Sequence, residues 1–356
     1  MELKKALTYE EQVQQLKEKH NLFIESDDNA CSILSRVNYY RLSAYGIGLK
    51  MIDNLELYVK GTSIDTLYRL YIFDSKFRNI LFHTVEHIEI QFRTQIANYL
   101  ALKYGPECYT DHKYFNTIYN QYGKDVFETL TNDFLEECKR QRNLPFVIHH
   151  NKKYEGHFPI WVAVELFTFG RLTSLFSIMK DEDTKVIASL YQTRFKHLKS
   201  WLLSLVEIRN LCAHYGRIYN MPLKQKPYMF KEYNKYQTAG IQKVFPVIIT
   251  MKLMLEKCKS PQWKSTYYEL CALFEEYSDV IKLSFIGFPE DWKLILQPID
   301  TCIDSNNRDT AFQSDDSQEK VELVKSILSC ISDTTEIGEI KEERLDKMSQ
   351  NASKSL

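Results

Sequence analysis

The stretch of sequence that decides the fold and the chemistry of this chain is Glu207-Ile208-Arg209-Asn210-Leu211-Cys212-Ala213-His214-Tyr215-Gly216-Arg217. On a helix, residues three or four apart share one face, so Asn210, His214 and Arg217 form a polar row that Glu207 extends backwards. The other side carries an apolar stripe that consists of Leu202, Leu205, Ile208, Cys212, Tyr215 and Tyr219. Such a stripe is typical of a helix that lies on a core. The stretch therefore predicts a helix with one buried side and one polar side.

This stretch contains the residue types that metal-independent cleavage of RNA requires. Arg209 can neutralise phosphate charge through a planar fork of donors, and the His214 imidazole can transfer a proton near neutral pH. We expect His214 to act on the ribose 2′-hydroxyl or the leaving 5′-oxygen, Arg209 to bind the scissile phosphate, and Asn210 to orient one of them. The chemistry is confined to RNA by the 2′-hydroxyl and requires no metal or other cofactor. An ordinary buried polar cluster is the alternative interpretation.

An Arg followed closely by a His occurs twice more, once at the same spacing of five residues and once at seven, so spacing alone is weak evidence. The two further pairs are Arg78 with His83 and Arg142 with His149. The first would be a second motif within one chain, although an intrahelical ion pair between Arg78 and Asp74 is the simpler interpretation. The second pair crosses a proline, so we expect it to lie in a loop.

Several blocks along the chain carry a family resemblance. They are residues 7–13, 37–45, 73–94, 159–170, 209–220 and 287–292. In this order they resemble the motifs of the Abi-like (AbiD/AbiF-type) abortive-infection proteins, which belong to the HEPN superfamily of ribonucleases. In the central block the resemblance rests on Arg78, Glu86, Glu89 and Arg93, and we expect Glu86 or Glu89 to face the site and orient Arg209.

The resemblance implies a mainly α fold, a multi-helix HEPN-type domain with an N-terminal helical extension. It implies a bacterial antiphage protein, a toxin that cleaves RNA, and a structured non-coding RNA that restrains it. It also implies a homodimer with the active site at the interface. A dimer would solve a geometric problem, because residues five apart on a straight helix diverge by about 140°, so Arg209 and His214 of one chain do not converge.

Two clusters are candidates for RNA binding. Tyr39, Tyr40 and Arg41 offer rings and a guanidinium for stacking, and Arg217, Lys224 and Lys226 offer positive charge for phosphates. The alternatives are helix packing for the tyrosines and a solvated surface for the lysines.

Composition agrees with a helical intracellular protein. Only 11 Gly and 9 Pro among 356 residues leave little room for a turn-rich β architecture. The eight Cys lack the spacing of a zinc site or a disulfide framework, and no apolar stretch of membrane-spanning length occurs. We therefore expect a cytoplasmic protein without a metal and without a membrane partner.

The net charge of −1 conceals a division of the chain. Residues 301–356 carry 12 Asp+Glu and 7 Lys+Arg, a net charge of −5, which leaves +4 for residues 1–300. We predict an N-terminal helical region at 1–60, a helical body at 61–300, and an acidic, weakly ordered tail at 301–356 with one short helix at about 317–331.

Periodicity and capping signals place the elements. Helices are predicted at 8–24 with a capping box at Thr8, at 28–44, and at 63–104 with a break or bend near Asp74. Further helices are predicted at 112–141, 160–179, 242–258 and 262–282. The segment 184–219 should form two helices split at 194–197, with Gly216 as a bend or terminus. Short strands are expected near 47–60 and 145–150.

Two other functions stay open. The same residues could grip phosphate without catalysis in an RNA-binding or RNA-chaperoning module. The hypothesis of a transferase has weaker support, because the sequence contains no Gly-rich phosphate loop and no paired-Asp metal motif.

Overall fold

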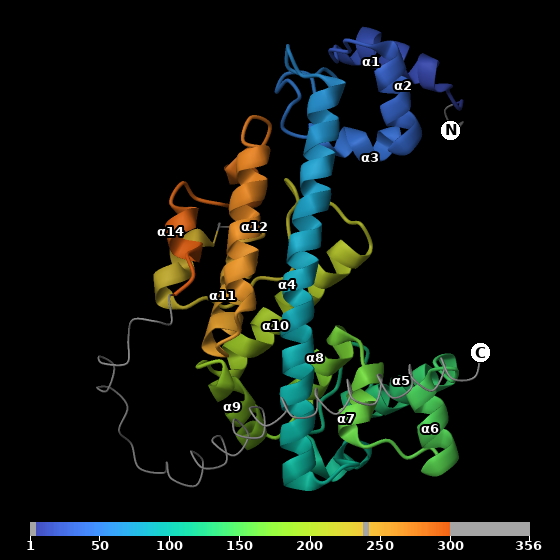
Figure 1. The fold of residues 1–356 in the computed structure, drawn as a ribbon, viewed down its shortest axis with the longest axis vertical. Coiled ribbons are helices and arrows are strands. Elements are labelled where there is room, and N and C mark those ends of the chain that lie inside the picture. Colours follow the sequence, from blue (N-terminus) through green and yellow to red (C-terminus); the bar gives the residue numbers. More distant parts are fainter. Residues whose placement is uncertain (1–4, 238–241, 300–356) are drawn as a thin grey trace, which may run out of the picture.

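The computed structural model describes residues 5–237 and 242–299, and these residues form a mainly α-helical protein (Figure 1). The predicted fold class is thus confirmed. Within the described ranges, β pairing is limited to isolated bridges. One of them joins Lys50 and Tyr58 in the segment 47–60, where a short strand was expected. The predicted tail and its helix at about 317–331 lie outside the described residues. No described helix has both the length and the apolar character needed to cross a membrane.

Helix α4 (Ile64–Tyr104) is the axis of the molecule. Its 41 residues extend about 60 Å at 1.5 Å per residue. The Ser63 side chain caps its start by accepting a bond from the Thr66 amide, and Gly105 ends it, both as predicted. The predicted break near Asp74 is wrong: the helix is continuous, because no proline or glycine interrupts it and the Asp74 carboxylate is satisfied inside the core.

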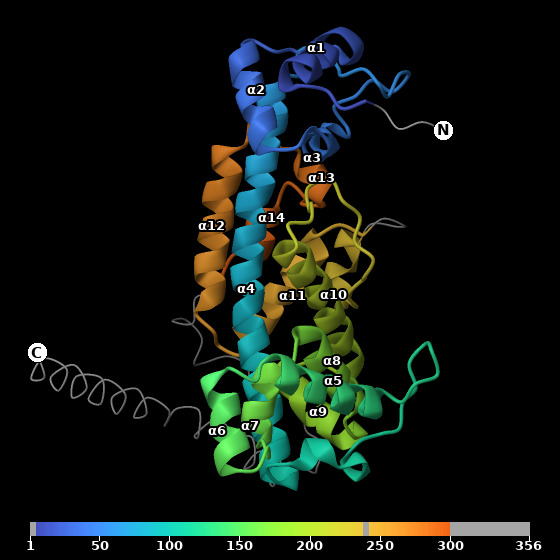
Figure 2. The same cartoon turned by 90° about the vertical axis from the view of Figure 1, so that its right-hand side faces the viewer.

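The body is built around one apolar face of α4. That face carries Phe73, Phe77, Leu81, Val85, Ile88 and Phe92, all of which are buried. Its neighbours are α7 (Ile160–Ala163), α8 (Phe169–Ile178), α10 (Phe195–Ala213), α11 (Phe245–Lys257) and α12 (Gln262–Glu276). Helix α12 runs along one side of α4, while α10 and α11 lie on the other (Figure 2). Helices α13 (Leu283–Ile286) and α14 (Trp292–Leu296) complete this body.

The N-terminal helices, α1 (Tyr9–His20), α2 (Asp27–Arg36) and α3 (Tyr39–Ser43), pack on the first turns of α4 around a separate apolar cluster. The predicted capping box at Thr8 is present. The predicted helix 28–44 is divided, because Val37 is extended and Asn38 begins a new helix by accepting a bond from the Tyr40 amide at 2.8 Å.

Three further helices lie around the far end of α4, and they are α5 (Val126–Arg140), α6 (Pro145–Lys153) and α9 (Asp181–Leu190). The strand expected at 145–150 is wrong, since Pro145 occupies the first turn of a helix, where a proline is tolerated. His149 therefore lies on α6 and not in a loop. Of the helix predicted at 112–141, only its second part forms, and 160–179 is divided into α7 and α8. The predicted division of 184–219 is confirmed by α9 and α10.

The buried carboxylate of Asp74 joins α4 to two distant segments. It accepts bonds from the Arg78 guanidinium, from the Tyr45 hydroxyl at 2.7 Å, and from the amides of Ile218 and Tyr219. Burial raises the pKa of Asp74, and Arg78, Tyr45 and the two amides act in the opposite direction. The chain that follows α10 is thereby fixed against α4.

Replacement of Asp74 tests this junction. Asp74→Asn leaves Arg78 buried without a charged partner, so we expect the free energy of unfolding to fall by about 3–5 kcal/mol. Tyr45→Phe removes one donor and should cost only about 1 kcal/mol. Urea denaturation would measure both, and equal losses for the two variants would contradict the assignment of Asp74 as the centre of the junction.

Candidate functional site

Helix α10 ends in a tight turn that fixes the main chain of His214. His214 is the C-cap residue, and Tyr215 follows in the left-handed region with φ of 57°. The amides of Tyr215 and Gly216 donate to the carbonyls of Cys212 at 3.1 Å and Leu211 at 2.7 Å. This is the Schellman arrangement, with tyrosine in the position that glycine usually occupies. The prediction that Tyr215 continues a buried stripe is wrong: the helix has ended, and Tyr215 is 70% exposed.

Glu89 of α4 links two arginines at the contact between α4 and α10. One carboxylate oxygen accepts from Arg93 at 2.7 Å, and the other lies 3.7 Å from Nε of Arg209. Arg93 also donates to the carbonyl of Val164, which follows α7. The side chains of Glu89 and Arg93 are 12% and 11% exposed, whereas that of Arg209 is 33% exposed. Arg209 therefore lies at the edge of the contact, partly open to solvent.

Asn210 and His214 occupy the exposed surface next to Arg209. The Asn210 side-chain oxygen lies 3.4 Å from the Arg209 guanidinium. The His214 side chain is exposed and has no hydrogen-bond or ion-pair partner in the part of the chain that the structure describes. The structure thus brings Arg209 beside Asn210 and leaves the imidazole of His214 open to solvent at the end of the helix.

The other residues of the central block have different environments. Arg78 is buried against Asp74, away from solvent. Glu86 is exposed and lies 3.8 Å from His83, whose ring contacts His87 at a centroid distance of 4.7 Å. Glu89, and not Glu86, is the carboxylate that lies beside Arg209.

Two of the arginines expected to contact RNA bond to main-chain oxygens. Arg41 donates to the carbonyl of Tyr215 at 2.7 Å. Arg217 is half-buried, and it donates to the carbonyls of Ala44 at 2.9 Å and Tyr219 at 3.1 Å. Their contacts with RNA stay predictions, and sequence patterns gave no sign of these main-chain bonds.

The remaining RNA-binding candidates are open to solvent to different degrees. Tyr40 is 86% exposed, whereas Tyr39 is half-buried, and burial raises its pKa. Lys224 and Lys226 are exposed. Their loop is held by the carboxylate of Glu207, which accepts bonds from the amides of Lys224 at 2.8 Å and Gln225 at 2.7 Å.

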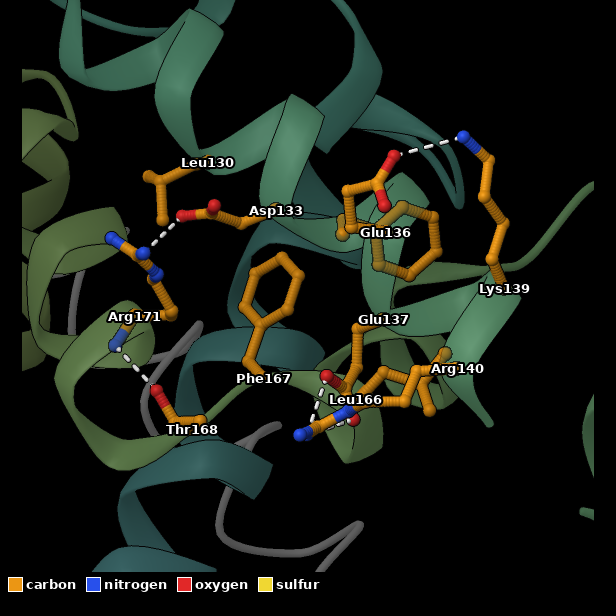
Figure 3. Close-up of a pocket in the computed structure, with 11 residues that line it drawn as sticks. Leu130, Asp133, Glu136, Glu137, Lys139, Arg140, Leu166, Phe167, Thr168 and Arg171 are labelled. Carbon is orange, nitrogen blue, oxygen red and sulfur yellow. Dashed lines mark hydrogen bonds and ion pairs between the residues drawn. The ribbon is translucent and has the colours of Figure 1, made fainter. Parts of the chain in front are cut away.

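A cavity of about 610 Å³ lies elsewhere, between α5 and the start of α8 (Figure 3). Its wall contains Phe134 and Phe167 together with three pairs of opposite charges, which are Asp133 with Arg171, Glu136 with Lys139, and Glu137 with Arg140. Because each of these cations already contacts a carboxylate, the cavity offers little to a phosphate. Within the described residues, no group of three or more His, Cys, Asp or Glu side chains is arranged to hold a metal ion.

Comparison with known proteins gives one finding. The family model described as Abi-like protein matches residues 32–220, a span that begins in α2 and ends with the turn after His214. Searches of curated proteins and of solved structures gave no significant match. The matched span contains Arg209, Asn210, His214 and Glu89, and it covers more than half of the 356 residues. The chain belongs to the Abi-like protein family, which supports a role in abortive infection.

Proposed function

We propose that this protein is a metal-independent endoribonuclease of the HEPN type that acts in abortive infection through Arg209, Asn210 and His214. The observation that carries the proposal is the imidazole of His214, which is exposed at the end of α10 and has no hydrogen-bond or ion-pair partner among the described residues. An imidazole that is open to solvent and free of protein partners within the described residues can exchange protons with a bound ligand near neutral pH.

The electrostatic environment of Arg209 suits a phosphate ligand. The charge of Glu89 is already balanced by Arg93 at 2.7 Å, and the longer 3.7 Å contact reaches only Nε of Arg209. Among the described residues, the only hydrogen bond of the outer nitrogens of Arg209 is the long contact with Asn210 at 3.4 Å, so they can bind a ligand. A guanidinium held in this way can donate two bonds to a phosphate as negative charge builds on its oxygens.

The proposed reaction needs one base and one acid. A base removes the proton of the ribose 2′-hydroxyl, whose oxygen attacks the adjacent phosphorus and forms a cyclic 2′,3′-phosphate. The P–O bond to the next nucleotide breaks, and an acid protonates the leaving 5′-oxygen. Neutral imidazole can do the first step and imidazolium the second. A single His214 can do both in turn, because the proton that it takes from the 2′-hydroxyl makes it the imidazolium that protonates the leaving oxygen.

The geometry of one chain favours a site shared by two copies. Arg209 points toward α4, whereas His214 lies beyond the last helical turn on the exposed side. Exposed apolar side chains occur on the helices around this contact, with Phe82 and Ile90 on α4, Trp161 on α7 and Leu203 on α10. Such residues are suited to the centre of an interface with a polar rim. We therefore propose a two-fold dimer in which the two α10 helices face each other.

A basic and aromatic surface next to α10 is a candidate path for the RNA. Lys196 lies over the ring of Tyr228 at 5.3 Å, and this ring is about half exposed. Lys224 and Lys226 are exposed in the adjoining loop. Stacking rings with interspersed cations bind single-stranded RNA with little sequence preference. A structured non-coding RNA that restrains the protein would use the same surface.

Substitution of the catalytic candidates tests the reaction. His214→Ala and Arg209→Ala should each abolish RNA cleavage and cellular toxicity without unfolding the protein, and EDTA should not reduce wild-type activity. His214→Gln keeps a hydrogen-bonding side chain but cannot transfer a proton, so it should bind RNA and fail to cleave it. Cleavage of a labelled RNA and a filter-binding assay would measure both. Full defence by His214→Gln, with no cleavage by the wild type, would favour a non-catalytic RNA-binding module.

Mixed dimers test whether the site is shared. In a dimer of an Arg209→Ala chain and a His214→Ala chain, one of the two sites keeps both native residues. Co-expression should therefore restore about a quarter of wild-type activity if the chains pair at random. A matched control combines His214→Ala with the double variant Arg209→Ala/His214→Ala, which leaves no intact site. The shared site would be refuted by a monomer in sedimentation at working concentration, or by no recovery in the mixture.

The role of Glu89 is tested against a neighbour on the same helix. Glu89→Gln removes the charge that holds Arg209 and Arg93, so we expect cleavage to fall at least about ten-fold and stability to fall by about 1–3 kcal/mol. Glu86→Gln changes an exposed carboxylate of α4 and should alter neither. Single-turnover kinetics and thermal unfolding would measure these effects. Equal kinetics for the two variants would show that Glu89 does not organise the site.

A further inference from the structure

The N-terminal helices are bonded to the chain directly after His214. Arg41 of α3 donates to the carbonyl of Tyr215 at 2.7 Å, Arg217 donates to the carbonyl of Ala44 at 2.9 Å, and Asn220 donates to the carbonyl of Ile47 at 2.9 Å. The first of these bonds joins residues 174 positions apart in the sequence. The residues that these bonds hold in the segment after α10, which are Tyr215, Arg217 and Asn220, all lie within six residues of His214.

The bond from Arg41 falls on a strained residue. Tyr215 has a left-handed main chain, which costs a residue other than glycine about 1–2 kcal/mol. Such conformations persist where surrounding contacts over-determine them. Here the contacts are the two bonds that close helix α10, and the bond from Arg41 to the carbonyl of Tyr215 itself.

The main chain on either side of this residue is fixed by other bonds. Helix α10 holds His214, and the Asp74 carboxylate holds the amides of Ile218 and Tyr219. The three residues between them are 215–217. A Cβ at Gly216 would lie 3.2 Å from the Leu211 carbonyl oxygen, so this part of the turn has little room for a side chain. Arg41 holds the first residue of that short span, the one bonded directly to His214.

We propose that Arg41 is a positioning residue, through which the N-terminal helices set the orientation of His214 for catalysis. This inference rests on the proposed ribonuclease function. It gives Arg41 a role different from a phosphate contact, because its guanidinium is engaged with a peptide carbonyl of the same chain. The N-terminal helices then contribute to turnover without touching the RNA at this point.

The two roles of Arg41 predict different kinetics. If Arg41 positions His214, Arg41→Ala in the full chain should lower the single-turnover rate by about ten-fold to a hundred-fold, as a displaced catalytic group does. RNA affinity should stay unchanged, and so should the slope of log K against log salt. A lost phosphate contact would instead weaken binding and reduce that slope by about one. Weaker binding with an unchanged rate would overturn the proposal.

Arg36→Ala is the matched control. Arg36 is an exposed arginine of α2, and its Nε donates to the carbonyl of Ser32 within the same helix at 3.0 Å. Its loss removes the same charge from the N-terminal helices without changing any bond to the segment after α10. We expect wild-type kinetics from this variant. A rate equal to that of Arg41→Ala would show that only the general charge matters.

A rescue variant tests the mechanism of positioning. Asparagine adopts the left-handed conformation more readily than tyrosine, so Tyr215→Asn should restore part of the rate lost in Arg41→Ala. Tyr215→Asn alone shows what the exposed ring contributes. A double variant no faster than Arg41→Ala would contradict the argument from main-chain strain.

Amide hydrogen exchange gives a readout that does not need activity. Arg41→Ala should accelerate exchange at the amides of Gly216 and Ile218, and Arg36→Ala should not. A wild type that does not cleave RNA, with exchange that still differs between the Arg41→Ala and Arg36→Ala variants, would refute the proposed function. In that case the coupling of Arg41 to the turn after α10 stands. Identical exchange in the two variants would refute the coupling whatever the enzymatic result.

Discussion

The carboxylate of Asp74, which is fully buried, is the constraint on which the rest of the structure depends. A buried charge is tolerated only where it is paired and its remaining lone pairs are satisfied. Asp74 meets this condition with Arg78 on its own helix, Tyr45 from the N-terminal segment, and two amides from the chain after α10. Three parts of the sequence must therefore converge on one point of α4. This convergence places the end of α10, and with it His214, between α4 and the N-terminal helices.

A second carboxylate on the same helix, that of Glu89, holds side chains near the surface and not main chain in the interior. Glu89 lies 15 residues after Asp74, about 22 Å along the helix, and it connects two arginines where α4, α7 and α10 meet. Asp74 fixes a main-chain segment in the interior, whereas Glu89 holds the side chain of Arg209 at the surface. Because α4 is continuous between them, the two ends of the site are kept at a fixed separation by one rigid element. A bend in α4 would change the relation of Arg209 to the turn that carries His214.

Local signals in the sequence were sufficient for much of the fold but not for the contacts that shape the site. The capping box at Thr8 and the end of α4 at Gly105 were predictable because each depends on a few neighbouring residues. Helix α6 was missed because its short apolar run also suits a strand. The bend or terminus expected at Gly216 falls within three residues of the end of α10, but the left-handed residue of the turn is Tyr215, where glycine is usual. The bond between Arg41 and Tyr215 joins distant segments, and neither periodicity nor spacing in one sequence can reveal it.

Division of the proposed site between two copies has a consequence for control. If Arg209 and His214 act together only across an interface, the fraction of active sites follows the monomer–dimer equilibrium, so dilution alone suppresses cleavage. A protein harmful to its own cell gains from such dependence, because a small amount stays inactive. The N-terminal helices would add a second requirement if the bond from Arg41 to Tyr215 sets the orientation of His214 within each copy, as we propose. Assembly would then bring the two halves of the site together, and the intrachain bond would make each half competent.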